Sequence, residues 1–333
     1  MQTDDAARDR LVGRRVLITG GLGFIGSTLA IRLVEAGAVV TLIDSLVPEY
    51  GGNIHNVAGI ADRVRINISD VRDPFSFAHL VRDQEILFNL AGQTSHMDSM
   101  TDPKTDLDIN CAAQLSILEA CRRHNPGVRL VFASTRQIYG RPRYLPVNEE
   151  HPLQPVDVNG VNKLAGENYH ILYQQVHGIP TTVLRLTNVI GPRMRIRDAR
   201  QTFVGIWIRN LIEGKPIEVW GGSQLRDLLD VEDCVDAFLM AAMKPAAVGQ
   251  IYNVGSPESI SLADLGREVV AANGGGEIIT REYPADRKRI DIGDYCTDAR
   301  KIAAEIGWTA RTPLSRTLTR CFDFYRAQIG HYT

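Results

Sequence analysis

The sequence has few cysteines, and no two of them are spaced as a metal-binding or disulfide pattern requires. The five cysteines are odd in number, lie far apart and include no C-x-x-C pair. This spacing argues against a zinc site and against the disulfide framework of small secreted domains. We therefore expect reduced thiols, no bound metal ion and a cytoplasmic protein.

Long apolar runs and a strong charge of one sign are also missing. No stretch approaches the roughly 18 uncharged apolar residues that a membrane-spanning helix needs, and the polar start, MQTDDAARDR, does not resemble a signal peptide. The net charge is −2, and the basic residues are dispersed along the chain. We therefore expect neither a membrane nor a nucleic acid as a partner.

The stretch 15–37 places three glycines between an apolar strand and an amphipathic helix. Residues 16–18 have the β-branched, apolar character of a buried parallel strand, and Gly20, Gly23 and Gly26 follow them. This spacing predicts a tight turn, a close approach of the backbone to a phosphate, and close packing of the helix on the strand. The N-terminus of the helix then offers unpaired N–H groups to an anion.

A second predicted strand, 39–43, ends in an acidic residue, Asp44. It follows the glycines at about the 20-residue distance typical of dinucleotide-binding motifs. A carboxylate at this point accepts hydrogen bonds from the adenosine ribose and repels a 2′-phosphate. The order of strand, glycines, helix, strand and acid therefore predicts a dinucleotide site that prefers NAD to NADP.

The rest of the first half alternates between strand and helix patterns. The predicted strands are 64–66, 86–90, 130–133 and 182–186, and the predicted helices include 107–121 and 160–176. This alternation predicts an α/β fold with a doubly wound (Rossmann) parallel sheet.

After Gly191 the pattern changes to short strands and helices, such as the helix 203–212 and the strand 217–219. We expect a first domain over 1–190 and a smaller mixed α/β substrate lobe over 191–333. The segment 231–255, which holds the apolar run 251–254, is a candidate to return to the first domain.

Eight blocks of sequence, in order, resemble the extended short-chain dehydrogenase/reductase family, and within it the nucleotide-sugar epimerases and dehydratases. They are TGGLGFIG, LIDSL, SDVRD, NLAGQTSHMDSMTDP, FASTRQIYG, NGVNKLAGE, LRLTNVIGPR and QLRDLLDVEDCVDAF. The resemblance implies that the first domain binds NAD and that the second lobe binds a nucleoside-diphosphate sugar. It also implies that a hydride leaves the sugar for the nicotinamide and normally returns after chemistry on the keto sugar.

The resemblance, carried over residue by residue, assigns the cofactor to the glycine turn, the ends of the first four strands and two helices. These residues are Gly20, Gly23, Phe24, Ile25, Gly26, Asp44, Ser45, Asp70, Val71, Leu90, Ala91, Gly92, Asn110 and Lys163. It assigns the substrate to His96, Asn188, Trp220, Arg226 and Arg287. The two arginines among them match positions that hold the diphosphate, for which a guanidinium is well suited.

The catalytic set of the family is a Ser or Thr, a Tyr and a Lys, the last two spaced Y-x-x-x-K on a helix. Thr135 and Lys163 match this set, but Asn159 stands at the Tyr position. No tyrosine lies between Tyr144 and Tyr169 to replace it. An amide is not a general base near neutral pH, and the loss of a positioned base typically costs about 10²- to 10⁴-fold in rate.

Three explanations for the missing tyrosine stay open. Another group supplies the base, with His96, Tyr139 and Tyr144 as candidates; or Lys163 acts directly or through water; or the protein binds a nucleotide sugar without rapid turnover. His96 lies in the block that follows the fourth predicted strand, where ligands sit in such sheets. The alternative interpretation of His96 is a loop histidine that faces solvent.

The two residues after Thr135 bear on the type of reaction. The family's 4,6-dehydratases use an Asp-Glu pair there to eliminate water, but here the positions are Arg136 and Gln137. This departure disfavours 4,6-dehydration, and Gln137 also counts against the decarboxylating branch. Epimerisation is left as the least demanding reaction; the alternatives are a net oxidoreductase and a non-catalytic binding protein.

Two further features are expected to lie near the substrate or at a subunit interface. Arg193, Arg195, Arg197 and Arg200 form a basic run that we interpret as a solvated charged face, with substrate contact as the alternative. The helices near 105–123 and 160–176 correspond to those that form a dimeric four-helix interface in many relatives. The resemblance therefore implies a homodimer.

Overall fold

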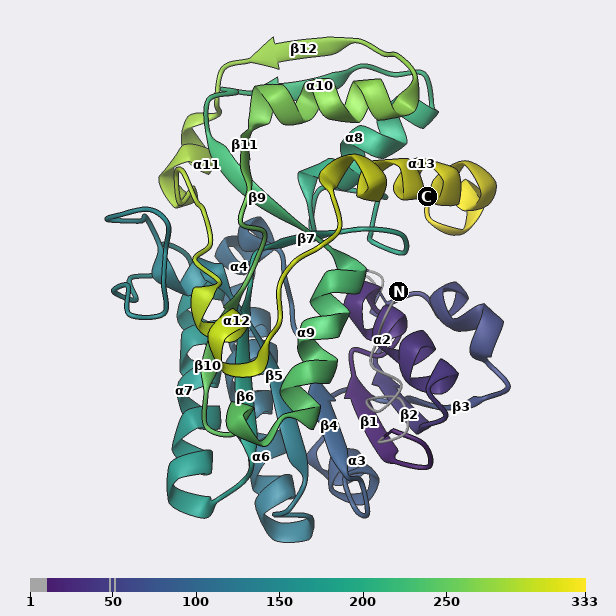
Figure 1. The fold of residues 1–333 in the computed structure, drawn as a ribbon, viewed down its shortest axis with the longest axis vertical. Helices are drawn as coiled ribbons and strands as arrows, with labels where there is room; N and C mark the ends of the chain where they lie inside the picture. The colour runs from purple at the N-terminus through teal and green to yellow at the C-terminus, as the bar shows by residue number, and fades with distance from the viewer. Residues whose placement is uncertain (1–10, 48, 51) are drawn as a thin grey trace.

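The computed structural model describes residues 11–47, 49–50 and 52–333 and is built around a large parallel sheet (Figure 1). Its strand order is β10-β6-β5-β4-β1-β2-β3, and every neighbouring pair is parallel. The strands are β1 (Arg15–Thr19), β2 (Val39–Asp44), β3 (Val64–Ile68), β4 (Ile86–Asn89), β5 (Arg129–Thr135), β6 (Thr181–Leu186) and β10 (Ile251–Val254). This order confirms the predicted doubly wound sheet.

Helices cover both faces of the sheet because its strands alternate their apolar side chains between two cores. Val16 and Ile18 of β1 pack in one core with α2 (Phe24–Glu35) and α9 (Val231–Met243). Leu17, between them, packs in the other. The helices of that second face are α3 (Pro74–Leu80), α6 (Ala113–His124) and α7 (Val158–His177).

A smaller lobe lies beyond the carboxyl ends of the strands (Figure 1). It contains a three-stranded sheet, β7 (Asn188–Ile190), β9 (Leu225–Asp230) and β11 (Ser259–Ser261), and a two-stranded one, β8 (Ile217–Trp220) and β12 (Ile278–Arg281). Its core is formed largely by α8 (Phe203–Ile212), α10 (Leu262–Asn273) and α13 (Leu314–Gln328). Between these segments the chain returns to the large sheet, where β10 pairs with β6.

Two local departures from the predicted elements shape the region between the lobes. β5 extends to Thr135, so this residue ends a buried strand at the edge that faces the smaller lobe. The predicted helix 107–121 is instead α5 (Pro103–Leu107), a π-helical turn η2 (Asp108–Ala112) and then α6. A π-turn inside a helix is frequent at functional sites because it shifts the side chains that follow it.

Across the described ranges, every helix is too short or too polar to cross a bilayer. The five cysteines are free thiols, three of them buried.

Candidate active site

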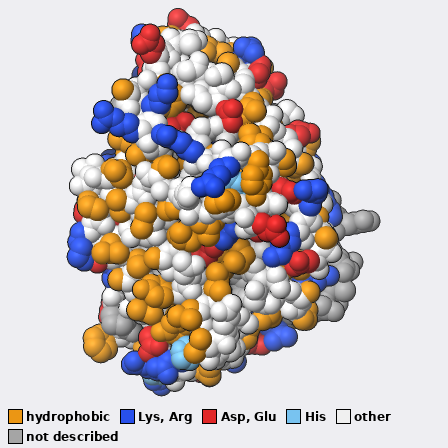
Figure 2. Space-filling model, turned by 90° about the vertical axis from the view of Figure 1, so that its left-hand side faces the viewer, with side chains coloured by type: hydrophobic (Ala, Val, Ile, Leu, Met, Phe, Trp, Pro, Cys, Tyr) orange, Lys and Arg blue, Asp and Glu red, His pale blue; other side chains and the backbone are white. Residues whose placement is uncertain are grey.

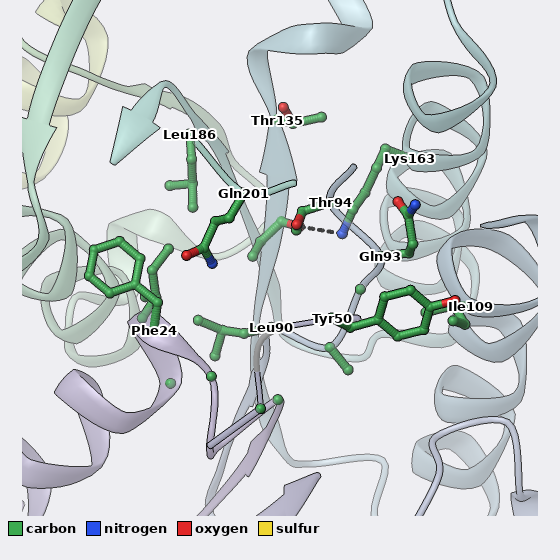
Figure 3. Close-up of a pocket in the computed structure, with 18 of the residues that line it drawn as sticks. Phe24, Tyr50, Leu90, Gln93, Thr94, Ile109, Thr135, Lys163, Leu186 and Gln201 are labelled. Carbon is green, nitrogen blue, oxygen red and sulfur yellow. Dashed lines mark hydrogen bonds between the residues drawn. The ribbon is translucent and has the colours of Figure 1, made fainter. Parts of the chain in front are cut away.

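The glycine turn opens onto a cleft at the carboxyl ends of β1, β2, β4 and β5 (Figure 3). Gly20 has φ +66°, a conformation that suits glycine. A Cβ on Gly26 would overlap the carbonyl oxygen of Gly20, so the helix can approach the turn only without a side chain there. Gly23 caps α2 without a side-chain hydrogen bond, which leaves the first N–H groups of the helix to an anionic ligand.

Two carboxylates lie along the cleft at the ends of β2 and β3. Asp44 accepts hydrogen bonds from the backbone N–H groups of Leu22 (3.0 Å) and Leu46 (2.9 Å). Burial raises the pKa of Asp44, and these hydrogen bonds oppose the shift. Asp70 is held by the side chain of Arg72, whose hydrogen bonds lower the pKa of Asp70. Both lie where the sequence places the adenosine half of a dinucleotide.

Thr135 and Lys163 line the middle of the cleft, at the end of β5 and on α7 (Figure 3). The ammonium of Lys163 donates a hydrogen bond to the carbonyl of Ala133 (3.3 Å). Burial lowers the pKa of Lys163 to about 8, and the charge of Asp106 opposes that shift. The hydroxyl oxygen of Thr135 accepts a hydrogen bond from the N–H of Gln137 (3.2 Å), so its own hydrogen can be donated into the cleft.

Asn159, at the position of the family's tyrosine, is held in a buried network beside Lys163. Its amide donates to the carbonyl of Gln93 (2.8 Å) and to Asp106 (3.0 Å). Asp106 is fully buried, and it also accepts hydrogen bonds from the amides of Asn162 (2.8 Å) and Asn110 (3.1 Å). Asn159 therefore serves as a structural hydrogen-bond donor in this network.

His96 begins the short helix α4 (His96–Thr101) and lines the cleft. Its Nδ1 lies 2.9 Å from Oδ2 of Asp157, a carboxylate whose side chain is fully buried. Burial would raise the pKa of Asp157, but its contacts with His96, Gly160 and Gln137 outweigh burial and lower the pKa. Nδ1 and Oδ2 are not aligned as a hydrogen bond, but the nearby negative charge of Asp157 favours the tautomer with a proton on Nδ1, which leaves Nε2 as the basic nitrogen.

The hydroxyl groups of Tyr139 and Tyr144, the two tyrosines considered as bases, form hydrogen bonds with other residues. Tyr139 is buried, and its hydroxyl donates to Asn253 (2.6 Å) and accepts from Arg185 (2.8 Å). Burial raises the pKa of Tyr139 to about 12. Tyr144 is exposed and donates to Asn148 (3.0 Å). Within the described chain, neither is among the residues that line the cleft.

Of the other residues assigned from the sequence, some line the cleft and others do not. The cleft is lined by Gly20, Gly23, Phe24, Ile25, Gly26, Asp44, Ser45, Asp70, Val71, Leu90, Ala91, Gly92, His96, Thr135, Asn159, Lys163 and Asn188. Asn110 lies behind Gly92: a Cβ on that glycine would come within 2.9 Å of its Oδ1. Trp220 packs edge-on against Tyr283 in the smaller lobe.

The structure describes the side chain of only one of the two arginines assigned to the diphosphate. The Arg226 guanidinium donates to Asp291 (2.8 Å) and to the carbonyls of Leu225 and Gly293, so it is already engaged within the lobe. The side chain of Arg287 lies outside the described part of the structure.

Two arginines of the basic run after Gly191 form close ion pairs with carboxylates, while Arg197 is exposed. Arg195 pairs with Asp198 (2.5 Å). Arg200 pairs with Asp98 of α4 (2.6 Å) and with Asp198 (3.0 Å). Arg200 therefore ties this loop of the smaller lobe to the helix that carries His96.

Several residues that line the cleft were missed in the sequence. Gln93 and Thr94 lie in the loop that follows β4, so the rule that ligands lie at the carboxyl ends of parallel strands could have found them. Tyr50, Gln201 and Thr202 come from irregular segments (Figure 3). They carry no local signal: Tyr50 lies in the loop after β2, and Gln201 and Thr202 reach the cleft from the segment that leads into α8.

Comparison with known proteins agrees with this geometry. Residues 16–255 match the model of the NAD dependent epimerase/dehydratase family. The chain is 31% identical to UDP-glucose 4-epimerase of Mycolicibacterium smegmatis, over 94% of this chain and 98% of that protein. It is 29% identical to dTDP-glucose 4,6-dehydratase of Streptomyces niveus, over 94% and 93% of the two chains.

A solved structure supports the same relationship. The UDP-glucose 4-epimerase of Thermus thermophilus in complex with NAD superposes with a TM-score of 0.83 at 29% identity, over 94% of this chain and 99% of that one. The glycine turn, the uncapped helix N-terminus, Asp44 and Lys163 fit such a dinucleotide, because they offer backbone donors, a ribose acceptor and a cation along one cleft.

Replacing Lys163 with methionine should stabilise the ligand-free protein while weakening its affinity for NAD. The buried ammonium is penalised as long as it is charged, so we expect Lys163→Met to raise the free energy of unfolding by about 1–3 kcal/mol at pH 7. The gain should be complete below the folded pKa of about 8 and shrink as the pH rises from there toward 10.5. Urea unfolding of the variant and the parent at several pH values measures this gain in the free energy of unfolding.

Lys215→Met, at an exposed lysine, is the matched control and should change stability little. A Lys163→Met protein that is less stable than the parent at pH 7 would contradict the assignment of a desolvated ammonium.

Proposed function

Because the chain belongs to the NAD-dependent epimerase/dehydratase family, we propose that it is an NAD-dependent epimerase of a nucleoside-diphosphate sugar, acting through a transient keto sugar. One observation carries the proposal: Thr135, Lys163 and the His96–Asp157 pair meet at the cleft onto which the glycine turn opens. Along one cleft, this set offers a hydrogen-bond donor, a cation and a base, which are the groups that oxidation of a carbinol needs.

In this proposal each group has a separate task. Bound NAD supplies the hydride acceptor and, later, the hydride donor. His96 takes the hydroxyl proton of the sugar on Nε2, while Asp157 stabilises the resulting imidazolium. Thr135 donates a hydrogen bond to the reacting oxygen, and Lys163 holds the nicotinamide ribose. Return of the proton from His96 as the hydride returns leaves the enzyme unchanged.

The residues next to Thr135 favour epimerisation over elimination of water. Arg136 donates to Asn188 (2.7 Å), and Gln137 donates to Asp157 (2.8 Å). Neither side chain can protonate a departing hydroxide or take a proton from carbon as a carboxyl group does. An epimerase needs only oxidation, exposure of the other face of the keto sugar, and reduction.

Incubation of the NAD-loaded protein with a panel of nucleotide sugars in D₂O, followed by NMR, tests the activity. We expect inversion at one sugar carbon with the cofactor retained in its oxidised form at the end. NADH formed in proportion to substrate would instead show a net oxidoreductase, and loss of water would show a dehydratase. Binding of several nucleotide sugars without any product would show a binding protein.

Replacement of the proposed base gives the second test. His96→Gln should lower kcat by about 10²- to 10⁴-fold, the usual contribution of a general base, and leave the affinity for NAD unchanged. Asp157→Asn should also lower kcat, although an asparagine can still cap α7. Steady-state kinetics measure both, with His124→Gln, on the exposed surface of α6, as the control.

A His96→Gln protein that keeps kcat within about twofold would contradict the role of His96. If its rate also rose as the pH passed through 8, the pKa of Lys163, the base would be Lys163 instead.

We further propose that the protein is a homodimer through the face that carries α7. Val161, Leu172 and Val176 of α7 are 53%, 47% and 63% exposed, and their spacing places them on one side of the helix. Figure 2, which views the side of the molecule where α7 lies in Figure 1, shows hydrophobic side chains gathered there. Exposed apolar patches of this kind commonly mark interfaces.

Charges placed on this face should separate the subunits. We expect the double substitution Leu172→Glu and Val176→Glu to shift sedimentation from dimer to monomer. Ile54→Glu, at a 58% exposed residue near α2, should leave the dimer intact. Sedimentation of the parent protein as a monomer at micromolar concentration would refute the proposal.

A further inference from the structure

The cleft contains an arginine whose charge no carboxylate of the described chain pairs with directly. Arg136 begins the turn η3 (Arg136–Tyr139), directly after Thr135, and lines the cleft. Its guanidinium donates to two neutral amide oxygens, at 2.7 Å to Asn188 and 3.4 Å to Gln137. Its Nε is buried and has no hydrogen-bond partner.

Two other buried arginines, Arg185 and Arg226, are paired with carboxylates, whereas Arg129 at the start of β5 donates to the backbone carbonyls of Ala241 and Lys244. Arg185 forms an ion pair with Glu167, and Arg226 forms one with Asp291. A buried cation without such a pair is costly, because its lost hydration is not replaced. Arg136 differs from Arg185 and Arg226 in having no carboxylate pair, and from Arg129 in lining the cleft, where an anion from outside the chain can reach it.

The surroundings of Arg136 hold its guanidinium in place without neutralising it. Its Cζ lies 5.4 Å from the centre of the Tyr295 ring, a stacking contact that orients the planar group. Burial lowers the pKa of Arg136, the charge of Arg226 lowers it further, and the charges of Asp227 and Asp291 only partly oppose this shift. Asp227 is a nearby carboxylate, but it accepts its side-chain hydrogen bonds from the hydroxyls of Thr187 and Thr297.

The place of Arg136 next to Thr135 in the chain favours the sugar ring of the substrate as its ligand. It adjoins Thr135, which we have placed at the reacting hydroxyl. When the reacting carbon is C4 of a pyranose, the C5 substituent is its neighbour, whereas the anomeric oxygen that carries the diphosphate lies across the ring. A planar carboxylate on C5 also matches the donor fork of a guanidinium.

We propose that Arg136 is a specificity residue that selects nucleoside-diphosphate sugars with a carboxylate on the ring, that is, nucleoside-diphosphate uronic acids. This inference rests on the proposed function, because it uses the same cleft and the same reacting position. The proposed contact between Arg136 and the carboxylate already exists when the substrate binds. A measurement of substrate affinity is therefore enough to test it.

Isothermal titration of the NAD-loaded protein with matched ligands tests the inference. The probes are UDP-glucose and UDP-glucuronic acid, GDP-mannose and GDP-mannuronic acid, and UDP and GDP alone. Within each pair only a hydroxymethyl group and a carboxylate differ. We expect the parent protein to bind the uronic acid of at least one pair about 10-fold or more tightly than its neutral partner.

Arg136→Gln should abolish that preference by weakening the uronic acid about 10- to 100-fold, with the neutral sugar and the free diphosphate within threefold of the parent. Arg136→Lys keeps the positive charge but loses the paired donors of the guanidinium, so it should lose part of the preference for the uronic acid. This variant replaces Arg136→Gln in the test if the glutamine variant does not fold. Arg193→Gln is the control, because Arg193 contacts Thr28 and Glu232 away from the cleft lining.

Two results would overturn the inference alone: equal affinity of the parent for both members of each pair, or an equal loss for the uronic acid, the neutral sugar and the free diphosphate in Arg136→Gln. The second would place Arg136 on the diphosphate. Failure of every nucleotide sugar and diphosphate to bind would overturn the proposed function itself, and this inference with it.

Discussion

A single buried carboxylate, Asp106, organises the floor of the cleft. It accepts hydrogen bonds from Asn110 of the π-helical turn and from Asn159 and Asn162 of α7, and its charge acts through space on Lys163. Three separate segments are thereby held at one point that water does not reach. Loss of any of these donors would leave part of a buried charge without a partner, which is far more costly than loss of an exposed hydrogen bond.

This network gives Asn159 a physical role. A tyrosine at this place would extend a phenol into the cleft, whereas the asparagine turns its amide toward Asp106 and Gln93. α7 then supplies the cation, Lys163, and the wall of the site. In the mechanism that we propose, the base comes from α4 and the selection of the substrate from η3, two short elements that leave the ends of β4 and β5.

The fold was predictable because each strand and helix carries its own signal. The glycine turn, the apolar strands and the helix 203–212 were recognised from local patterns, and the structure reproduces them. Local patterns were weaker where tertiary contacts set the backbone. The π-turn at Asn110 reads as ordinary helix in the sequence, and the extension of β5 to Thr135 depends on its pairing with Leu186 of β6.

The sequence by itself determined the cofactor half of the cleft, because a glycine turn, a helix N-terminus and an acidic strand end are contiguous or separated by one βαβ unit. Tertiary structure decided the substrate half. It paired His96 with Asp157, 61 residues away, engaged Arg226 with Asp291, and placed Arg136 beside the amide of Asn188. The partners in these pairs lie tens of residues apart, so no short stretch of sequence contains both of them.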